Sequence, residues 1–79
     1  MLTDYILAAM GHAACEDLED EGWYGHIPGF DGLWASGPSL EETLHELRSA
    51  LEDWLLIGLR LGHPLPVIDG IDLNVQHVA

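Results

Sequence analysis

The sequence of residues 39–62 is SLEETLHELRSALEDWLLIGLRLG, and it predicts the one long helix of the chain. Ser39 and Glu42 have the spacing of a capping box, in which the serine oxygen accepts a hydrogen bond from an early helix N–H and the glutamate reaches back. Apolar residues then recur every three to four positions, which is typical of an amphipathic helix. This stripe comprises Leu40, Leu44, Leu47, Leu51 and Leu55, widened by Ala50, Trp54, Ile57 and Leu61.

After this helix the chain is expected to turn back toward the sheet. Gly62 can adopt the left-handed conformation that ends a helix, and Pro64 and Pro66 prevent the helix from resuming. Residues 71–76 alternate apolar and polar side chains, which predicts a final strand. The pattern leaves open whether this strand pairs with its own sheet or with that of a neighbouring protomer.

Upstream of the long helix, the pattern predicts a short helix followed by three short strands. Apolar residues recur at helical spacing between Leu2 and Ala13 and predict a short first helix that ends near Gly11. The alternating residues 13–18 and 23–27 flank the polar reversal EDEG and predict a β-hairpin. Residues 28–32 contain proline and glycine and predict a loop, and residues 33–36 predict the third strand.

The predicted order is therefore α-β-β-β-α-β, an α+β fold in a single domain over residues 1–79. The long helix can cover only one face of a small antiparallel sheet, so the other face stays open unless something else covers it. A chain of 79 residues has marginal stability, and Cys15, its only cysteine, excludes an internal disulfide. We therefore expect a homo-oligomer, either a dimer or a tetramer, as the source of additional burial.

The charge of the chain is strongly negative. Fourteen carboxylates face only Arg48 and Arg60, which gives a formal net charge of -12. Such a surface repels the phosphate backbone of nucleic acids, so direct nucleic-acid binding is not expected. It attracts basic proteins, and a nucleic-acid-binding protein held by a phosphate-mimicking partner would match this sign of charge.

The sequence contains neither a recognisable export signal nor a predicted membrane span. Asp4 stands where a signal peptide carries a basic residue, and Gly11-His12 interrupt the apolar stretch that follows. The most apolar part of the long helix, residues 54–61, is far shorter than the roughly 20 residues that span a bilayer. The expected location is the cytoplasm, with no membrane contact.

No catalytic residue, metal ligand or cofactor site is predicted. The carboxylates near residue 41 are explained by the helix cap and by the solvated helix face, and the five histidines form no metal-binding motif. Cys15 has no identifiable activating partner, which favours an inert small hydrophobic residue over a nucleophile. A metal-dependent hydrolase would rest only on scattered carboxylates and histidines.

Aromatic residues gather in the hairpin and in the loop after it. Strand alternation places Trp23 and Tyr24 on opposite faces of the sheet, so at least one of them is expected to point away from the core. The pattern leaves an interface and the core as equally weighted locations for these rings. The residues that we select as candidates for a protein interface are Tyr24, His26, Phe30 and Trp34.

Four segments of the chain, taken in order, carry a resemblance to a known family. They are Gly22 with Tyr24, Ile27-Pro28-Gly29-Phe30-Asp31-Gly32, Gly37-Pro38-Ser39-Leu40-Glu41-Glu42, and Gly62-His63-Pro64-Leu65-Pro66. In this order and spacing the chain resembles the HicB-like antitoxin family, also called UPF0150-like, over nearly its full length. The resemblance implies a degenerate, partial RNase H-like fold without catalytic residues. It also implies a partner, a small basic RNA-cleaving toxin of the HicA type, which the antitoxin inhibits by occlusion.

Two functional hypotheses follow from the resemblance. The first is an antitoxin that neutralises a HicA-type toxin. The alternative is an orphan homo-oligomeric regulatory or structural subunit without a toxin partner. Many members of the family add a C-terminal DNA-binding domain. This sequence ends at Ala79, shortly after the predicted final strand, so we expect no separate DNA-binding domain.

Overall fold

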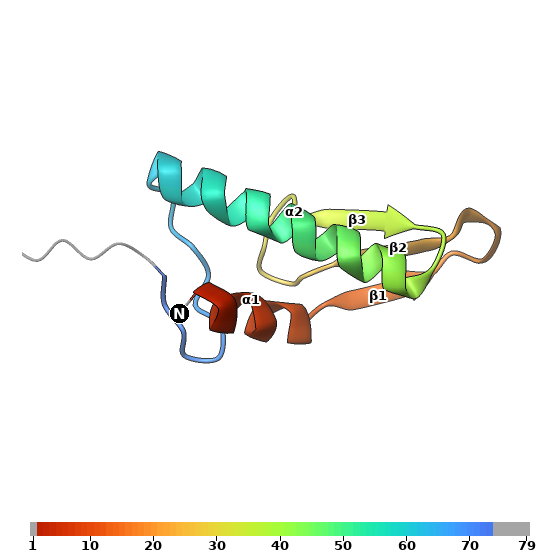
Figure 1. Cartoon of the computed structure of the whole chain (residues 1–79), viewed down its shortest axis with the longest axis horizontal. Helices are drawn as coiled ribbons and strands as arrows, with labels where there is room; N and C mark the ends of the chain where they lie inside the picture. The colour runs from red at the N-terminus through yellow and green to blue at the C-terminus, as the bar shows by residue number, and fades with distance from the viewer. Residues whose placement is uncertain (1, 74–79) are drawn as a thin grey trace, which may run out of the picture.

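The computed structural model describes residues 2–73, which form two helices and a three-stranded sheet (Figure 1). The elements are α1 (Leu2–Gly11), β1 (Ala14–Asp17), the short 3-10 turn η1 (Glu19–Glu21), β2 (Trp23–His26), β3 (Trp34–Gly37) and α2 (Leu40–Leu61). The predicted α+β class is confirmed, and so is the order α-β-β-β-α.

The predicted final strand is not found in the part of it that the structure describes. Ile68 and Ile71 form an isolated bridge, in which the backbone N–H of each donates to the carbonyl oxygen of the other, at 3.1 and 2.7 Å. Asp69 and Gly70, which lie between them, have positive φ angles of 49° and 80°. The chain therefore reverses on itself here instead of continuing along the sheet. Residues 74–76 of that predicted strand lie outside the described residues.

The sheet is antiparallel, with β2 between β1 and β3, and α2 lies across one of its faces (Figure 1). Gly25 in β2 lies opposite Cys15 and Ala35 in the neighbouring strands. A Cβ atom on Gly25 would lie 3.2 Å from the Cys15 Sγ and 3.2 Å from the Thr43 Cγ2 of α2. The missing side chain of Gly25 therefore allows α2 to pack closely against the centre of the sheet.

Helix α2 begins and ends where the sequence predicts. The Ser39 Oγ accepts a hydrogen bond from the Glu42 N–H at 3.2 Å, and the Thr43 Oγ1 donates to the Ser39 carbonyl at 2.8 Å. Gly62 has a φ of 71°, the left-handed conformation that ends a helix. Between these ends, the residues that α2 buries are Thr43, Leu47, Leu51, Leu55 and Gly58.

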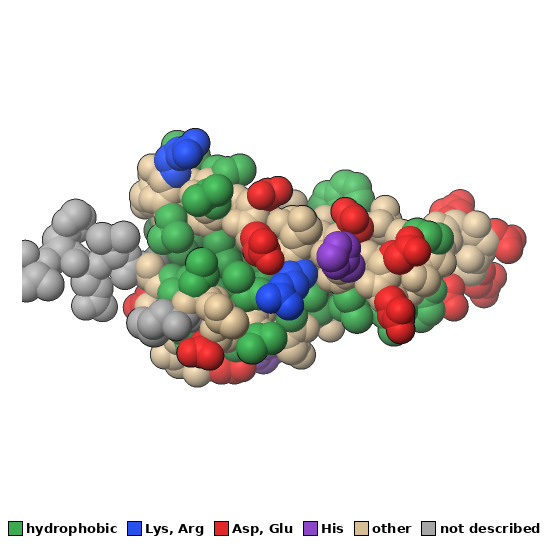
Figure 2. Space-filling model, viewed as in Figure 1, with side chains coloured by type: hydrophobic (Ala, Val, Ile, Leu, Met, Phe, Trp, Pro, Cys, Tyr) green, Lys and Arg blue, Asp and Glu red, His purple; other side chains and the backbone are tan. Residues whose placement is uncertain are grey.

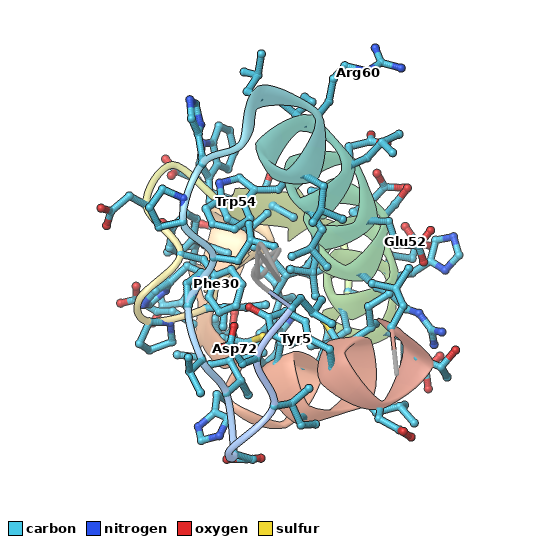
Figure 3. The ribbon with its side chains drawn as sticks, turned by 90° about the vertical axis from the view of Figure 1, so that its left-hand side faces the viewer. Tyr5, Phe30, Glu52, Trp54, Arg60 and Asp72 are labelled. Atoms are coloured by element: carbon cyan, nitrogen blue, oxygen red, sulfur yellow. The ribbon has the colours of Figure 1, made fainter. Side chains whose placement is uncertain are left out.

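A second part of the core joins α1 to the β2–β3 loop and α2. Tyr5 of α1 is fully buried, and its ring meets that of Phe30 edge to face, with 6.2 Å between the ring centroids. Phe30 also packs against Trp54 of α2, with 5.0 Å between the centroids. Figure 3 shows the three rings close together, with Phe30 between Trp54 and Tyr5. The loop is therefore part of the core and not only a connection between strands.

Tyr5 also connects α1 to the segment that follows α2. Its hydroxyl donates a hydrogen bond to the Pro66 carbonyl oxygen, and the adjacent Leu65 is buried in the core. Burial of the Tyr5 hydroxyl, and secondarily the negative charge of Asp72, raise the pKa of this phenol above its usual value near 10. Ionised Tyr5 is therefore less favourable in the folded protein than in the unfolded chain.

We expect the protein to lose stability as the pH rises above about 10, because the unfolded chain then ionises Tyr5 more readily than the folded protein does. Tyr5→Phe should reduce the free energy of unfolding at neutral pH by about 1 kcal/mol, since the Pro66 carbonyl loses its donor. The same variant should lose part of the alkaline destabilisation. Urea unfolding at pH 8 and at pH 11 measures both effects, and Tyr24→Phe is the control. Equal alkaline losses in wild type and Tyr5→Phe would contradict this assignment.

Candidate functional site

The alternation of side chains along the strands gives the sheet two different faces. Gly25 and Ala35 are buried and point toward α2. The neighbouring positions point the opposite way, because successive strand residues alternate between faces. We call this second surface the outer face. Its residues are Ala14, Glu16, Tyr24, His26, Trp34 and Ser36.

Three aromatic side chains form a row on the outer face. His26 lies directly opposite Trp34 in the β2–β3 pairing. The Tyr24 ring stacks on the Trp34 ring, with 6.2 Å between the centroids and 25° between the planes, and it lies 5.7 Å from the His26 ring. Trp34 is 58% exposed. The structure thus brings three of the four selected residues into one cluster with an exposed tryptophan.

Phe30, the fourth selected residue, lies elsewhere. It is only 3% exposed and belongs to the core. The Phe30 N–H donates to the Ile27 carbonyl at 3.1 Å, and the Leu33 N–H donates to the Phe30 carbonyl at 3.2 Å. These two successive turns direct Ile27, Phe30 and Leu33 inward, and all three are buried. Phe30 therefore supports the fold beneath the loop instead of joining the outer face.

His26 has one ring nitrogen that is shielded from solvent. Its Nδ1 is buried and has no hydrogen-bond partner among the described residues. A buried N–H without an acceptor costs about 1–3 kcal/mol, so in the neutral ring the proton is favoured on Nε2. The ring contact that the structure gives for His26 is its packing against Tyr24, with 5.7 Å between the ring centroids.

The end of the sheet next to this row is strongly acidic. Asp17 ends β1, the turn between β1 and β2 carries Glu19, Asp20 and Glu21, and Glu16 lies on the outer face itself. The Asp17 Oδ1 accepts a hydrogen bond from the Glu19 N–H at 2.8 Å, which holds the start of the turn. Figure 2 shows acidic side chains gathered at the right-hand end of the molecule, where Figure 1 places this turn. The exposed aromatic row therefore lies beside a concentrated negative charge.

Within residues 2–73, no three His, Cys, Asp or Glu side chains are grouped so that they could hold a metal ion. His12 lies apart from the outer face, with its Nε2 2.8 Å from the Asp69 Oδ1. Neither helix in the described range is both long enough and apolar enough to cross a membrane. Within residues 2–73, exposed aromatic rings and a local concentration of charge occur together at the outer face.

A second exposed surface was not selected by the sequence reasoning. It is an apolar groove between α1 and the C-terminal half of α2. Its lining residues are Leu2, Ile6, Glu52, Leu55, Leu56 and Leu59. The signal that could have found it is the run of apolar residues 54–57, which is too continuous for one buried stripe. Which of these residues stay exposed depends on where α1 packs.

Comparisons with known proteins agree with the fold. The family model described as UPF0150-like matches residues 4–66. Among solved structures, the crystal structure of TTHA0281 from Thermus thermophilus is similar, with 42% sequence identity and a TM-score of 0.87. The match covers 96% of this chain and 95% of that chain. The search of curated proteins found no match.

Proposed function

Because the chain belongs to the UPF0150-like family, we propose that it is a HicB-like antitoxin that binds and neutralises a small, basic, RNA-cleaving toxin of the HicA type. The antitoxin acts in the cytoplasm as a binding protein without catalytic activity of its own. It inhibits the toxin by covering the surface that would otherwise bind RNA. The outer face and the adjacent acidic turn form the toxin-binding surface.

The observation that carries this proposal is the distribution of charge. Residues 1–46 contain ten of the fourteen carboxylates and neither of the two arginines. The ten are Asp4, Glu16, Asp17, Glu19, Asp20, Glu21, Asp31, Glu41, Glu42 and Glu46. A protein that cleaves RNA must present positive charge to phosphates, and the same charge is attracted to this half of the antitoxin.

The aromatic row supplies short-range packing energy, which charge alone does not provide. Exposed tryptophan and tyrosine are the residue types that most often dominate the energy of a protein interface. Trp34 and Tyr24 stack on each other, so their rings are already ordered before a partner arrives. Little conformational entropy is then lost on binding. The carboxylates around the row supply attraction over a longer range and orient the toxin.

Direct binding of nucleic acid to this surface is disfavoured by the same charges. Proteins that stack bases on aromatic rings combine those rings with basic residues that follow the phosphate backbone. Both arginines of this chain lie on α2, whereas the aromatic row lies on the face turned away from α2. The rings therefore suit a basic protein and not an RNA strand.

The test is co-expression of the chain with the small basic protein encoded beside it, followed by purification through a tag on this chain. We expect the two proteins to co-purify and the RNA cleavage by the basic protein to be suppressed at equimolar ratio. Binding should weaken steeply as NaCl is raised, because salt screens charges that stay partly exposed. Failure of capture at low salt, with cleavage unaffected, would rule out the antitoxin function.

The alternative function is a homo-oligomeric regulatory or structural subunit without a toxin. The observation that favours it is the apolar groove between α1 and α2, which offers a contact surface independent of the outer face. A stable homo-oligomer that fails to capture the neighbouring basic protein would support this alternative.

A further inference from the structure

The apolar groove is lined by several exposed leucine side chains. Leu2 is 49% exposed, Leu56 is 60% exposed and Leu59 is 38% exposed, although each lies beside buried core residues. In Figure 2 the hydrophobic side chains gather over the left half of the molecule, where Figure 1 shows α1 and the C-terminal half of α2. Contiguous exposed apolar surface of this kind commonly marks a contact with another protein.

The α2 side of the groove differs in charge from the rest of the chain, whereas its α1 side carries one carboxylate, Asp4. Residues 47–68 contain both arginines and only two carboxylates, Glu52 and Asp53, so this segment is neutral. All of the surplus negative charge therefore lies outside it. The Arg48 Nε lies 3.5 Å from the Glu52 Oε1 at the edge of the groove, so part of the local charge is already paired.

We propose that this groove is the contact surface between two copies of this chain. Two chains of net charge -12 repel each other, and their repulsion is smallest where the surface of each is neutral. A basic partner would gain little charge complementarity here, because Glu52, the carboxylate that lines the groove, already lies beside Arg48. The neutral, apolar surface thus fits a second copy better than it fits a basic protein.

The order of charges along α2 also fits a two-fold arrangement. Glu52 and Arg60 lie four residues before and four residues after Leu56, so the three share one stripe of the helix. Figure 3 shows Glu52 and Arg60 both directed outward from α2, on the side away from Phe30. If two α2 helices cross antiparallel at Leu56, Arg60 of each copy faces Glu52 of the other.

This dimer is independent of the proposed function. The outer face of the sheet is turned away from α2, whereas the groove is formed by α2 and α1. The dimer would therefore leave both outer faces free for a toxin. It would also remove apolar surface from water in a chain whose core is small.

The first test is sedimentation equilibrium of the purified full chain over a range of concentrations. We expect a reversible dimer whose dissociation constant falls as NaCl is raised, because salt screens the repulsion between the two chains. Toxin binding responds to salt in the opposite direction, so failure of either proposal can be distinguished from failure of the other. A chain that stays monomeric at all concentrations, at both low and high salt, would overturn the dimer.

Leu56→Glu tests the surface. It places two carboxylates against each other at the centre of the contact, so we expect the dissociation constant to rise at least about 100-fold. Ile57→Glu is the matched control, because Ile57 is 56% exposed on the same helix but lines a different hollow with His63 and Leu65. Both substitutions are at exposed positions, and thermal unfolding checks that both variants fold. Equal dimerisation of the two variants would overturn the proposed surface.

An exchange of the charges at Glu52 and Arg60 tests whether the two α2 helices cross antiparallel at Leu56. Glu52→Arg alone and Arg60→Glu alone should each weaken the dimer, because each sets two like charges opposite each other. The double variant restores both opposite-charge pairs, so its dissociation constant should return to within about threefold of the wild-type value. A double variant that is as weak as the sum of the single variants would contradict the antiparallel crossing at Leu56.

Discussion

Gly22→Ala is expected to reduce the free energy of unfolding by about 3–5 kcal/mol, which is a large part of the stability of so small a domain. Gly22 ends the turn between β1 and β2 with a φ of 86° and a ψ of -142°, a conformation open essentially only to glycine. In addition, a Cβ atom at this position would lie 2.5 Å from the carbonyl oxygen of Gly37. That oxygen belongs to the backbone of β3 and cannot move aside as a flexible side chain would.

The appropriate control is Gly32→Ala. Gly32 also has a positive φ, of 78°, but apart from Gly32 itself and its two chain neighbours no described residue has an atom within 4 Å of the position that its Cβ would take. Its substitution carries only the backbone strain, which we expect to cost about 1–2 kcal/mol. Urea unfolding of both variants followed by circular dichroism measures the difference. Equal losses would show that the contact between the turn and β3 has no energetic role.

Trp34→Ala is expected to weaken the binding of the proposed toxin by about 2–4 kcal/mol, or roughly 30- to 1,000-fold in dissociation constant. The reason is that Trp34 is the most exposed ring of the aromatic row, and Tyr24 already holds it in place. In the free protein the ring is mostly in water. Its removal should therefore change the free energy of unfolding by less than about 1 kcal/mol.

Ile57→Ala provides the comparison for this prediction. Ile57 is 56% exposed, nearly the same as Trp34, but it lies on α2 and not on the outer face. Isothermal titration calorimetry with the co-purified toxin should give wild-type affinity for Ile57→Ala. If Trp34→Ala also kept wild-type affinity, the toxin would have to bind elsewhere on the chain, even though the antitoxin function itself would stand.

The sequence predicts the fold well where the determinants are local. The bounds of α2 follow from Ser39 and Gly62, which form hydrogen bonds with backbone groups of the first and the last turn of the helix. The hairpin follows from alternating residues on either side of a polar turn. The same kind of alternation predicts the final strand, yet Ile71 pairs only with Ile68 in the described residues. Alternation shows that a segment can form a strand, but a sheet edge must be within reach for it to pair.

The selected site residues also divide into those that a local pattern could place and those that it could not. Strand alternation was sufficient to place Trp23 and Tyr24 on opposite faces of the sheet, because that alternation is a property of any extended chain. Phe30 could not be placed, since a loop has no such period, and its two successive turns became evident only in the structure. The apolar groove was missed because its exposure depends on the packing of α1 against α2, two elements separated by the whole sheet in sequence.

The order of helices and strands from α1 to α2 and the acidic character of the chain could therefore be predicted from the sequence alone. Secondary structure depends on backbone chemistry that acts over a few residues. The net charge depends on composition alone and not on the positions of the charged residues. The tertiary structure decided which aromatic rings reach solvent and which leucines stay exposed beside α1. Burial is a property of contacts between distant segments, so it exists only once those segments have packed together.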